Sequence, residues 1–393
     1  MTDNFKIEVL LDWNQALGIK DEWNDLNSKS GVSHPFTTYE WFDCWYRAYC
    51  NPSRARVILV REKGDNNLRA ILPGMLIKLK KGGITLNGFS YAGNGHSPRC
   101  GIISKEDDVE AKQSAIIAIW EHLEKKVDLA VFMSIEVGSP THFVLNNIKL
   151  PHLFLRIEHS FESPAFDISK GWDSYLATRS KKFRKRIRNG KNRAERLGKL
   201  NYNVISSGFI SEQDIERLKL IDNKTWQHRE GTGLFSTIEN GNFYRELLRT
   251  FGKHRPVILC LLQIGDRDVA YEVATSFCLT SFFLKYGYDP EFNKCSPGLL
   301  IQSHLGEYFS LLGYHEIDLV GEMTEEKEHW PTHKREHKNY WIINKGSLRG
   351  RILFEEIRSY RLLKKMIRMI KPDKPKNMPI GFPALPETEE ERD

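Results

Sequence analysis

A single carboxylate, Glu272, lies in an otherwise apolar run, VAYEVATSF, that has the length and composition of a strand. Burial in such a strand disfavours the charged form and raises the pKa of a carboxyl group toward neutrality. A group of that kind suits general-base catalysis, which works best when the pKa is near the operating pH. Strand alternation places Glu272 beside Ala270 and Ala274, which are small enough to leave room for a substrate. The alternative is that this face is solvated and Glu272 takes no part in chemistry.

A second chemical feature is the helix start at Ser296-Pro297-Gly298, which follows a predicted strand at Ser281–Gly287. Serine is a favoured N-cap, and proline suits the first helical position. The free N–H groups and the helix dipole at such a start attract anions, so a pyrophosphate could bind there. An ordinary strand–helix unit that binds nothing has the same pattern.

The order and spacing of several motifs resemble one family. They are Tyr288-Asp289-Pro290, Ser296-Pro297-Gly298, Gly313, Asp318, Gly321, Lys327 and Trp330. Together they resemble the GNAT-type acetyltransferases associated with cellulose and exopolysaccharide synthesis (the CelD/BcsL type), which are related to Fem-type aminoacyl-tRNA-dependent peptidyltransferases. The resemblance covers roughly residues 20–335. It implies an α/β (α+β) fold of two tandem GNAT-like domains, each a mixed, mainly antiparallel sheet flanked by helices.

The resemblance also implies acetyl-CoA or another acyl-CoA as co-substrate, with no metal. The segment equivalent to the family's phosphate loop supplies the expected coenzyme contacts, which are Asn293, Lys294, Ser296, Pro297, Gly298 and Leu299. Asp318 and Lys327 match family positions, so we expect catalytic roles for them beside Glu272. The implied acceptor is an amino or hydroxyl group of a sugar, glycan precursor or lipid-linked intermediate.

Acceptor-binding residues are predicted on both sides of the chain's midpoint. The glycine-rich loop Tyr91–Gly101 carries His96 and Arg99, and its glycines let the backbone approach a ligand closely. The aromatic helix through Tyr49, opened by Thr37-x-x-Glu40, supplies Trp41. The remaining candidates are Trp226, near the polar loop 228–233, and Tyr286, in the strand before the phosphate loop. A plain surface loop and an aromatic core helix are the alternatives for the first two segments.

The predicted organisation is an N-terminal, acceptor-side domain (1–170), a basic connecting helix (171–200), a C-terminal, acyl-CoA-binding domain (201–345), and an amphipathic helix with a disordered tail (346–393). Arg179–Lys199 holds eleven Lys/Arg and one acid, whereas the whole chain has a net charge of only +7. The basic character is therefore local, and nucleic acid is not an expected partner of the whole chain. Phe183, Ile187, Gly190, Ala194 and Leu197 form a narrow apolar seam on this helix.

Six cysteines without a metal-ligand spacing, no signal-peptide pattern and no long apolar run predict a cytoplasmic protein. The C-terminal helix could touch anionic lipid or pack on its own domain. The sequence thus predicts an N- or O-acyltransferase. The alternatives are a Fem-type transferase, which would take an amino acid from tRNA and which the basic helix favours, and a non-catalytic scaffold that keeps the fold.

Overall fold

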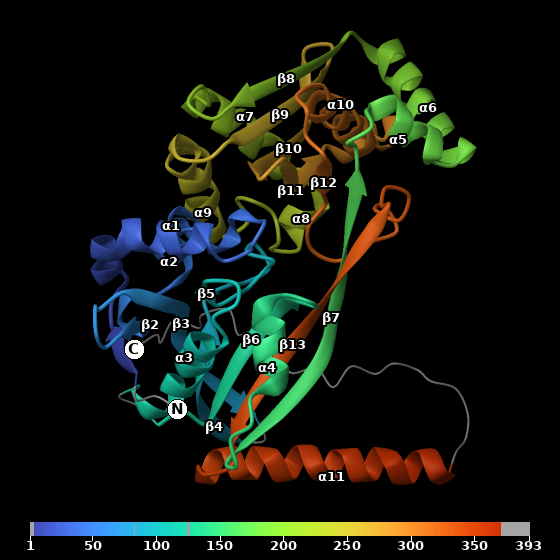
Figure 1. Ribbon diagram of the computed structural model, residues 1–393. Helices are drawn as coiled ribbons and strands as arrows, with labels where there is room; N and C mark the ends of the chain where they lie inside the picture. Colours follow the sequence, from blue (N-terminus) through green and yellow to red (C-terminus); the bar gives the residue numbers. More distant parts are fainter. Residues whose placement is uncertain (1–3, 82, 124–125, 371–393) are drawn as a thin grey trace, which may run out of the picture.

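The computed structural model describes residues 4–81, 83–123 and 126–370, the last part of this range (360–370) as helix backbone only. Its centre is one thirteen-stranded sheet with helices on both faces (Figure 1). The strand order is β1-β2-β3-β4-β6-β13-β7-β12-β11-β10-β9-β8, with β5 paired to β3. The predicted class, a mixed and mainly antiparallel sheet flanked by helices, is confirmed. The predicted disordered tail, 372–393, lies outside the described residues.

The N-terminal half contains the first six strands. These strands are β1 (Phe5–Leu10), β2 (Ala55–Glu62), β3 (Leu68–Lys81), β4 (Ile84–Tyr91), β5 (Ile103–Ser104) and β6 (Leu129–Glu136). Its helices are α1 (Lys20–Ser28), α2 (Tyr39–Tyr49), α3 (Val109–Glu121) and α4 (Pro140–Asn147), with 3-10 turns η1 (Trp13–Ile19), η2 (Pro35–Thr37) and η3 (Pro52–Arg54). The N-cap of α2 is Thr38, whose side chain accepts from the Trp41 N–H, so the predicted cap at Thr37 is wrong by one residue.

The C-terminal half contains β8 (Leu200–Ser206), β9 (Val257–Ile264), β10 (Arg267–Phe277), β11 (Thr280–Tyr288) and β12 (Glu316–Asp318). Its helices are α5 (Trp172–Thr178), α6 (Lys181–Leu197), α7 (Glu212–Asp222), α8 (Trp226–Arg229), α9 (Ile238–Arg249) and α10 (Pro297–Leu311), with 3-10 turns η4 (Phe251–Lys253) and η5 (Pro290–Cys295). The predicted basic connector is therefore two helices, α5 and α6, rather than one.

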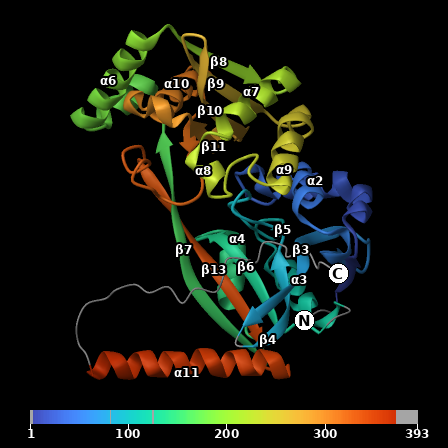
Figure 2. The same ribbon diagram turned by 180° about the vertical axis from the view of Figure 1, so that it is seen from behind.

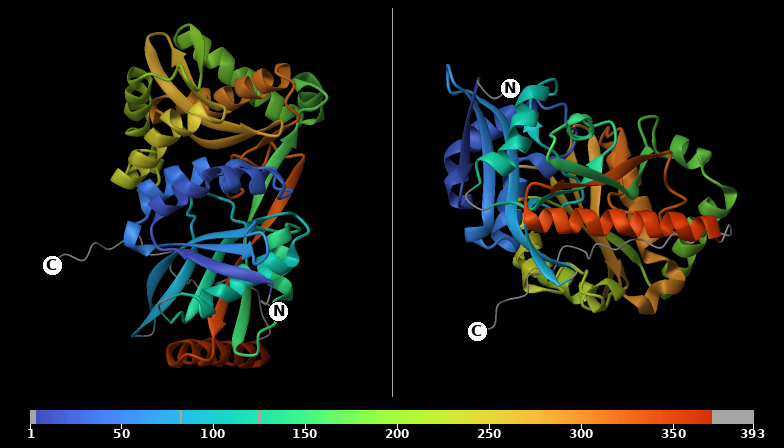
Figure 3. Two further views of the ribbon diagram at one scale, coloured as in Figure 1. Left: turned by 60° about the vertical axis from the view of Figure 1, so that its left-hand side comes forward. Right: turned by 90° about the horizontal axis from the view of Figure 1, so that it is seen from below.

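Two long strands connect the halves. β7 (Leu153–Asp167) and β13 (His333–Asn344) pair antiparallel along most of their length and run between the two halves (Figures 1 and 2). The last helix, α11 (Leu348–Ile370), lies across the far end of the N-terminal half and extends beyond it (Figure 3). Its described part buries Leu353 and Ile357. No helix within the described ranges is long and apolar enough to cross a membrane.

Each half repeats one strand arrangement: an antiparallel meander whose last strand then pairs parallel with the next. In the N-terminal half β4 pairs with β6 over Gly88–Ser90, and in the C-terminal half β11 pairs with β12 over Thr280–Phe282. Helix α2 packs against α9 across the two halves, where Trp41 meets Phe243 edge-to-face at 5.5 Å between ring centroids. The largest apolar cluster contains residues of both halves. This shared packing holds the two halves in a fixed position relative to each other.

Candidate active site

An opening between β11 and β12 forms the candidate site. The parallel pairing of these strands stops at Phe282 and Asp318, whereas β11 continues to Tyr288. The strands therefore separate, and the backbone groups on that edge of β11 have no neighbouring strand. The gap holds a cavity of about 380 Å³, which we call the β11–β12 cleft. The lining residues include His96 and Pro98 from the N-terminal half, Trp226, Gln227, residues 283–286, Gln302, and residues 319–322, 324, 326 and 327.

A β-bulge in β11 decides which side chains face the N-terminal half. The register between β10 and β11 shifts between Val273 and Ala274, and Leu284 is the extra residue. Phe283 packs in the cluster beneath α10, whereas Leu284 packs against the larger, shared cluster. Lys285 pairs with Val273, a member of that shared cluster, so Leu284 and Lys285 face the same way. Bulges commonly redirect a side chain next to a functional site.

Glu272 is fully buried on the face of β10 that packs against α10. Its neighbours on that face, Ala270 and Ala274, belong to the same apolar cluster as the buried residues of α10. The alternative of a solvated face is therefore wrong. Its Oε2 accepts a hydrogen bond of 3.1 Å from Gln302 Nε2, and its Oε1 has no partner among the described residues. Burial raises the pKa of Glu272 to about 8, although the Gln302 hydrogen bond and the nearby Lys327 act to lower it. Gln302 lines the cleft and connects it with this carboxyl group.

Lys327 lines the cleft, but its ammonium group donates all of its hydrogen bonds to nearby backbone carbonyls. Its Nζ donates to the carbonyl oxygens of Leu319 (3.1 Å), Val320 (2.7 Å) and Glu322 (3.1 Å). Burial lowers the pKa of Lys327 to about 8. An ammonium group has three donors, so none is left for a developing oxyanion. The geometry favours a positioning residue that holds the loop after β12, rather than the catalytic residue predicted from the resemblance.

Asp318 is fully buried and binds two arginines that come from different parts of the chain. Its carboxylate accepts from Arg99 and, at 3.0 Å, from Arg335 Nη1. It also accepts from the Val320 N–H at 2.9 Å, which fixes the chain as it leaves β12. Burial acts to raise the pKa of Asp318, but the two guanidinium groups outweigh it and the pKa is lowered. Asp318 joins the halves at the closed end of the cleft and is saturated, so its location does not favour the predicted catalytic role.

The predicted phosphate site at the start of α10 is partly open. Asn293 and Lys294 are exposed, and Ser296 has a left-handed backbone (φ 53°) and no side-chain cap hydrogen bond. Serine therefore serves here as the turn residue and not as the predicted hydrogen-bonding cap. Pro297 and Gly298 are buried: a Cβ at Gly298 would lie 3.0 Å from the Tyr286 ring. Leu299 is half-buried and packs in the cluster beneath α10.

Helix α6 crosses directly beside this turn. Gly190 allows the approach, because a Cβ there would lie 2.6 Å from the Cys295 carbonyl oxygen, and Arg193 Nη1 donates to the Lys294 carbonyl at 2.8 Å. Phe183, Gly190 and Ala194 of the predicted seam are buried, but Leu197 is 62% exposed and lies outside it. The outward face carries nine exposed cations, for which no ion pair is present within the described parts of the chain: Lys181, Lys182, Arg184, Lys185, Arg186, Arg188, Lys191, Arg193 and Arg196.

The predicted acceptor residues separate into three groups. His96, Trp226 and Tyr286 line the β11–β12 cleft. Arg99 instead lines a neighbouring cavity of about 420 Å³, where its guanidinium is held by Asp318. Trp41 is fully buried, and its Nε1 donates to Ser97 Oγ at 2.9 Å. The prediction that Trp41 contacts the acceptor is therefore not supported, because its ring packs in the core and braces the loop that carries His96.

His96 is held by the opposite half of the molecule. Its Nδ1 lies 3.0 Å from Tyr244 Oη, which comes from α9. Burial lowers the pKa of His96 to about 3, and the nearby Lys285 acts in the same direction, so the ring is neutral at pH 7. Tyr286 Oη donates to Glu326, across the mouth of the cleft. Trp226 is 45% exposed.

Sequence reasoning missed Lys285, Gln302 and Glu326. Gln302 carried a signal, because it is a lone amide among apolar residues on the buried face of α10. Lys285 was visible in SFFLKYG, but strict alternation from Phe283 would have turned it toward α10, and only the bulge reverses that direction. Glu326 gave no signal, because it lies in a run of acids typical of a solvated loop.

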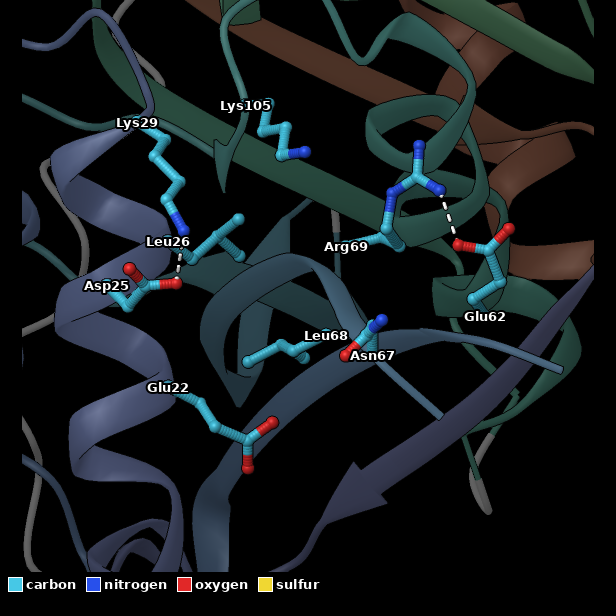
Figure 4. A pocket seen from close by; sticks show the side chains of 9 residues that line it. All are labelled: Glu22, Asp25, Leu26, Lys29, Glu62, Asn67, Leu68, Arg69 and Lys105. Carbon is cyan, nitrogen blue, oxygen red and sulfur yellow. Dashed lines mark hydrogen bonds and ion pairs between the residues drawn. The ribbon is translucent and has the colours of Figure 1, made fainter. Parts of the chain in front are cut away.

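Other cavities lie elsewhere. One of about 380 Å³ lies between α1 and β3 (Figure 4), and its wall pairs Lys29 with Asp25 at 2.6 Å and Arg69 with Glu62 at 2.7 Å. All of its lining residues belong to the N-terminal half. Within the described parts of the chain, no group of three or more His, Cys, Asp or Glu side chains could hold a metal ion.

Comparison with known proteins finds a family match within the C-terminal half. Residues 181–330 match the family model described as an acetyltransferase (GNAT) domain, a stretch that contains α6, the phosphate turn and the cleft. The chain is also similar to the crystal structure of FemX, with 14% identity, a TM-score of 0.57, and coverage of 83% of this chain and 96% of FemX. No curated protein sequence matches the chain.

Two further solved structures share the fold. The C-terminal domain of a putative lysylphosphatidylglycerol synthetase from Agrobacterium fabrum is 11% identical, with a TM-score of 0.53 and coverage of 87% of this chain and 96% of that one. A protein of unknown function from Bacteroides thetaiotaomicron is 12% identical, with a TM-score of 0.54 and coverage of 83% and 97%. The chain thus has a GNAT-type acyltransferase fold.

Proposed function

We propose that this protein transfers an acetyl or other acyl group from acyl-CoA to an amino or hydroxyl group of a sugar, glycan precursor or lipid-linked intermediate. The observation that carries the proposal is the β11–β12 cleft, in which a free strand edge, a bulge and a buried carboxyl group meet between the two halves. The acceptor class rests on the family resemblance of the sequence motifs.

The donor binds with its diphosphate at the turn before α10. The Gly298 and Leu299 N–H groups have no hydrogen-bond partner in the described structure, and the helix dipole adds a partial positive charge. The cations of α6 lie beside this turn and add a favourable field for the remaining phosphate. The pantetheine arm then follows the edge of β11, which places the thioester between the strands.

The acceptor enters from the side of His96 and Trp226. Its nitrogen or oxygen attacks the thioester carbonyl, the C–S bond breaks, and the coenzyme leaves as a thiolate. The bulged backbone at Leu284 offers an N–H to the oxyanion, because the extra residue of a bulge is not paired in the ladder. Glu272 takes up the acceptor's proton on its unpaired Oε1 through an intervening water, while Gln302 holds the other carboxylate oxygen in place. The thiolate is then protonated, and the free coenzyme leaves as a thiol.

Two measurements test this proposal. Calorimetry should detect acetyl-CoA binding, and thiol release from acetyl-CoA in the presence of glucosamine should be faster with the wild-type protein than with Glu272→Gln. The variant should keep its affinity for acetyl-CoA, because Glu272 does not lie at the phosphate turn. An equally fast Glu272→Gln variant would remove Glu272 as the base, and absence of acetyl-CoA binding would overturn the donor.

A Fem-type aminoacyl transferase is the second candidate function. One observation favours it: nine exposed cations on a single helix face form a larger phosphate-binding surface than one coenzyme needs. Incubation with charged tRNA and an amino-sugar peptide acceptor would show transfer in this case, with binding that weakens steeply as salt is added. Binding of neither acyl-CoA nor tRNA would leave the non-catalytic scaffold.

A further inference from the structure

The candidate cleft contains a cation that has no anionic partner. Lys285 is half-buried, lines the cleft, and is turned toward the N-terminal half by the bulge at Leu284. Among the described residues, no carboxylate oxygen lies within 4.0 Å of its ammonium group and no acceptor lies within hydrogen-bond distance. Burial lowers the pKa of Lys285, although the charge of Asp222 acts to raise it. A ligand anion beside the amine would favour its charged form, so the site is suited to an anionic group.

Asp222, the acid whose charge acts on Lys285, cannot serve as that partner, because its acceptor sites are already used. Asp222 influences Lys285 electrostatically, but its Oδ1 accepts from Tyr271 Oη (2.6 Å) and the Leu234 N–H (3.1 Å). Its Oδ2 accepts from the Phe235 N–H (2.9 Å) and lies 3.2 Å from His228 Nδ1. The carboxylate is fully buried and held in place by these four groups.

The other charged groups of the cleft are also occupied or turned elsewhere. Lys327 has three carbonyl acceptors, and Glu326 accepts the Tyr286 hydroxyl. Glu322 is exposed and forms no ion pair with Lys285. His96, the neighbouring polar group on the N-terminal side, has its Nδ1 on Tyr244. Lys285 is therefore distinguished from Lys327, the second lysine of the same cavity, by the absence of any protein acceptor.

We propose that Lys285 binds an anionic group, a carboxylate or a phosphate, on the acceptor substrate. The inference rests on the proposed function, because it assigns the N-terminal side of the cleft to the acceptor, and it narrows that acceptor to an anionic molecule. The ammonium sits one residue beyond the bulge, so the anion would be held close to the thioester carbonyl. The exposed Trp226 ring, in the same cavity, offers a flat apolar surface to the body of a sugar.

Site-specific chemical protection tests the inference without any acyl donor. The full-length protein is treated with trinitrobenzenesulfonate, which modifies neutral amines, and peptide mass spectrometry gives a rate for each lysine. We expect inorganic phosphate or acetate at millimolar concentration to slow the modification of Lys285 about tenfold or more. Lys6, exposed in the N-terminal half, serves as the remote control, and Lys181 reports general anion attraction to α6.

Each outcome is decisive. Protection by phosphate alone assigns a phosphorylated acceptor, and protection by acetate alone assigns a carboxylate. Unchanged labelling of Lys285 in both anions, equal protection of Lys6, or no labelling of Lys285 at all would overturn the inference. The labelling experiment contains no acyl-CoA. A failure of the protein to bind acyl-CoA would therefore refute the proposed function without changing what the labelling says about Lys285.

A kinetic arm compares acceptors that share one ring. Glucosamine, glucosamine 6-phosphate and glucosaminuronic acid differ only in the group at one carbon. Lys285→Met should raise KM for a charged acceptor about tenfold to a hundredfold more than it raises KM for glucosamine, and Lys285→Arg should restore much of the difference. An equal change for all three acceptors would mean that Lys285 only supports the fold of the cleft, and would contradict the proposal.

Discussion

The two halves contain the same strand arrangement, but the gap beside the parallel strand pair is filled in one half and open in the other. In each half three residue pairs join the parallel strands before the two strands diverge. In the N-terminal half the returning loop fills the gap: Cys100 forms a parallel bridge with Ile135 of β6, and Tyr91 Oη donates to the Gly101 carbonyl. In the C-terminal half the chain moves on into η5 and α10, and the gap becomes the β11–β12 cleft.

The contrast extends to the residues at the end of each parallel pair. Ser90 and Val131 end the N-terminal pair and are fully buried, so the gap is closed by packing. Phe282 and Asp318 end the C-terminal pair, and Asp318 is bound by two arginines. One arrangement can thus be a core or a cavity, depending on whether a loop returns to the free strand edge.

The largest expected effect follows from removing Asp318. Asp318→Ala leaves Arg99 and Arg335 without their shared anion at a buried position, so the free energy of unfolding should fall by about 3–5 kcal/mol in urea denaturation. Ile135→Val, at the packed gap, is the matched change and should cost about 1 kcal/mol. Equal losses in the two variants would mean that the two ends are held in the same way.

Replacing Glu272 tests whether the open gap is catalytic. Glu272→Gln keeps the shape and should lower kcat for acyl transfer on the order of 100-fold, because the proton acceptor is lost. Wild-type kcat should rise with pH and level off above about 8, where the carboxyl group is ionised, and the variant should lack this rise. A variant with the wild-type pH profile would contradict the assignment.

The same substitution predicts a stability difference with pH. The folded-state pKa of Glu272, about 8, is above the usual value of 4.5, so the folded protein binds more protons between these values. Its stabilising contribution is therefore complete below about pH 4.5 and is lost as pH rises through 8. Relative to Glu272→Gln, the wild type should become less stable by on the order of 4 kcal/mol from pH 5 to 9, measured by thermal unfolding.

Filling the open gap should make the C-terminal half resemble the N-terminal one. Thr324→Trp places a large ring in the β11–β12 cleft, and kcat/KM should fall about 100-fold because the reacting groups are displaced. Asn67→Trp, in the cavity of Figure 4, is the control and should leave activity as it is. A matching loss in both variants would show that the cleft has no special role.

The smallest effect is expected from the cations beside the phosphate turn. Arg186→Ala with Arg193→Ala should weaken acetyl-CoA binding about threefold to tenfold at low salt, and the loss should shrink at 0.5 M salt because exposed charges are screened. Lys6→Ala with Lys78→Ala removes the same charge from the N-terminal half and should not change the affinity. An equal loss of acetyl-CoA affinity in the two double variants would mean that α6 acts only through the net charge of the protein.

The local pattern of this chain determined much of its architecture and part of its site. An apolar run predicted the strand at Ser281–Gly287, which the structure contains within β11, and VAYEVATSF predicted a buried Glu272. These features depend on neighbours within a few residues, where propensity and alternation act. His96, Trp226 and Tyr286, which the sequence marked as residues near a loop or a strand end, all line the cleft, and their acceptor role stays a prediction.

Tertiary structure alone decided which of the charged residues are free. Asp318 and Lys327 looked alike as candidates in the sequence, but distant arginines and local carbonyls occupy them. Lys285 became a candidate only through a one-residue register shift between β10 and β11, which depends on pairing that no local pattern specifies. Whether a charge has a partner depends on residues far away in the chain, so only the folded molecule identifies the lysine that is left for a ligand.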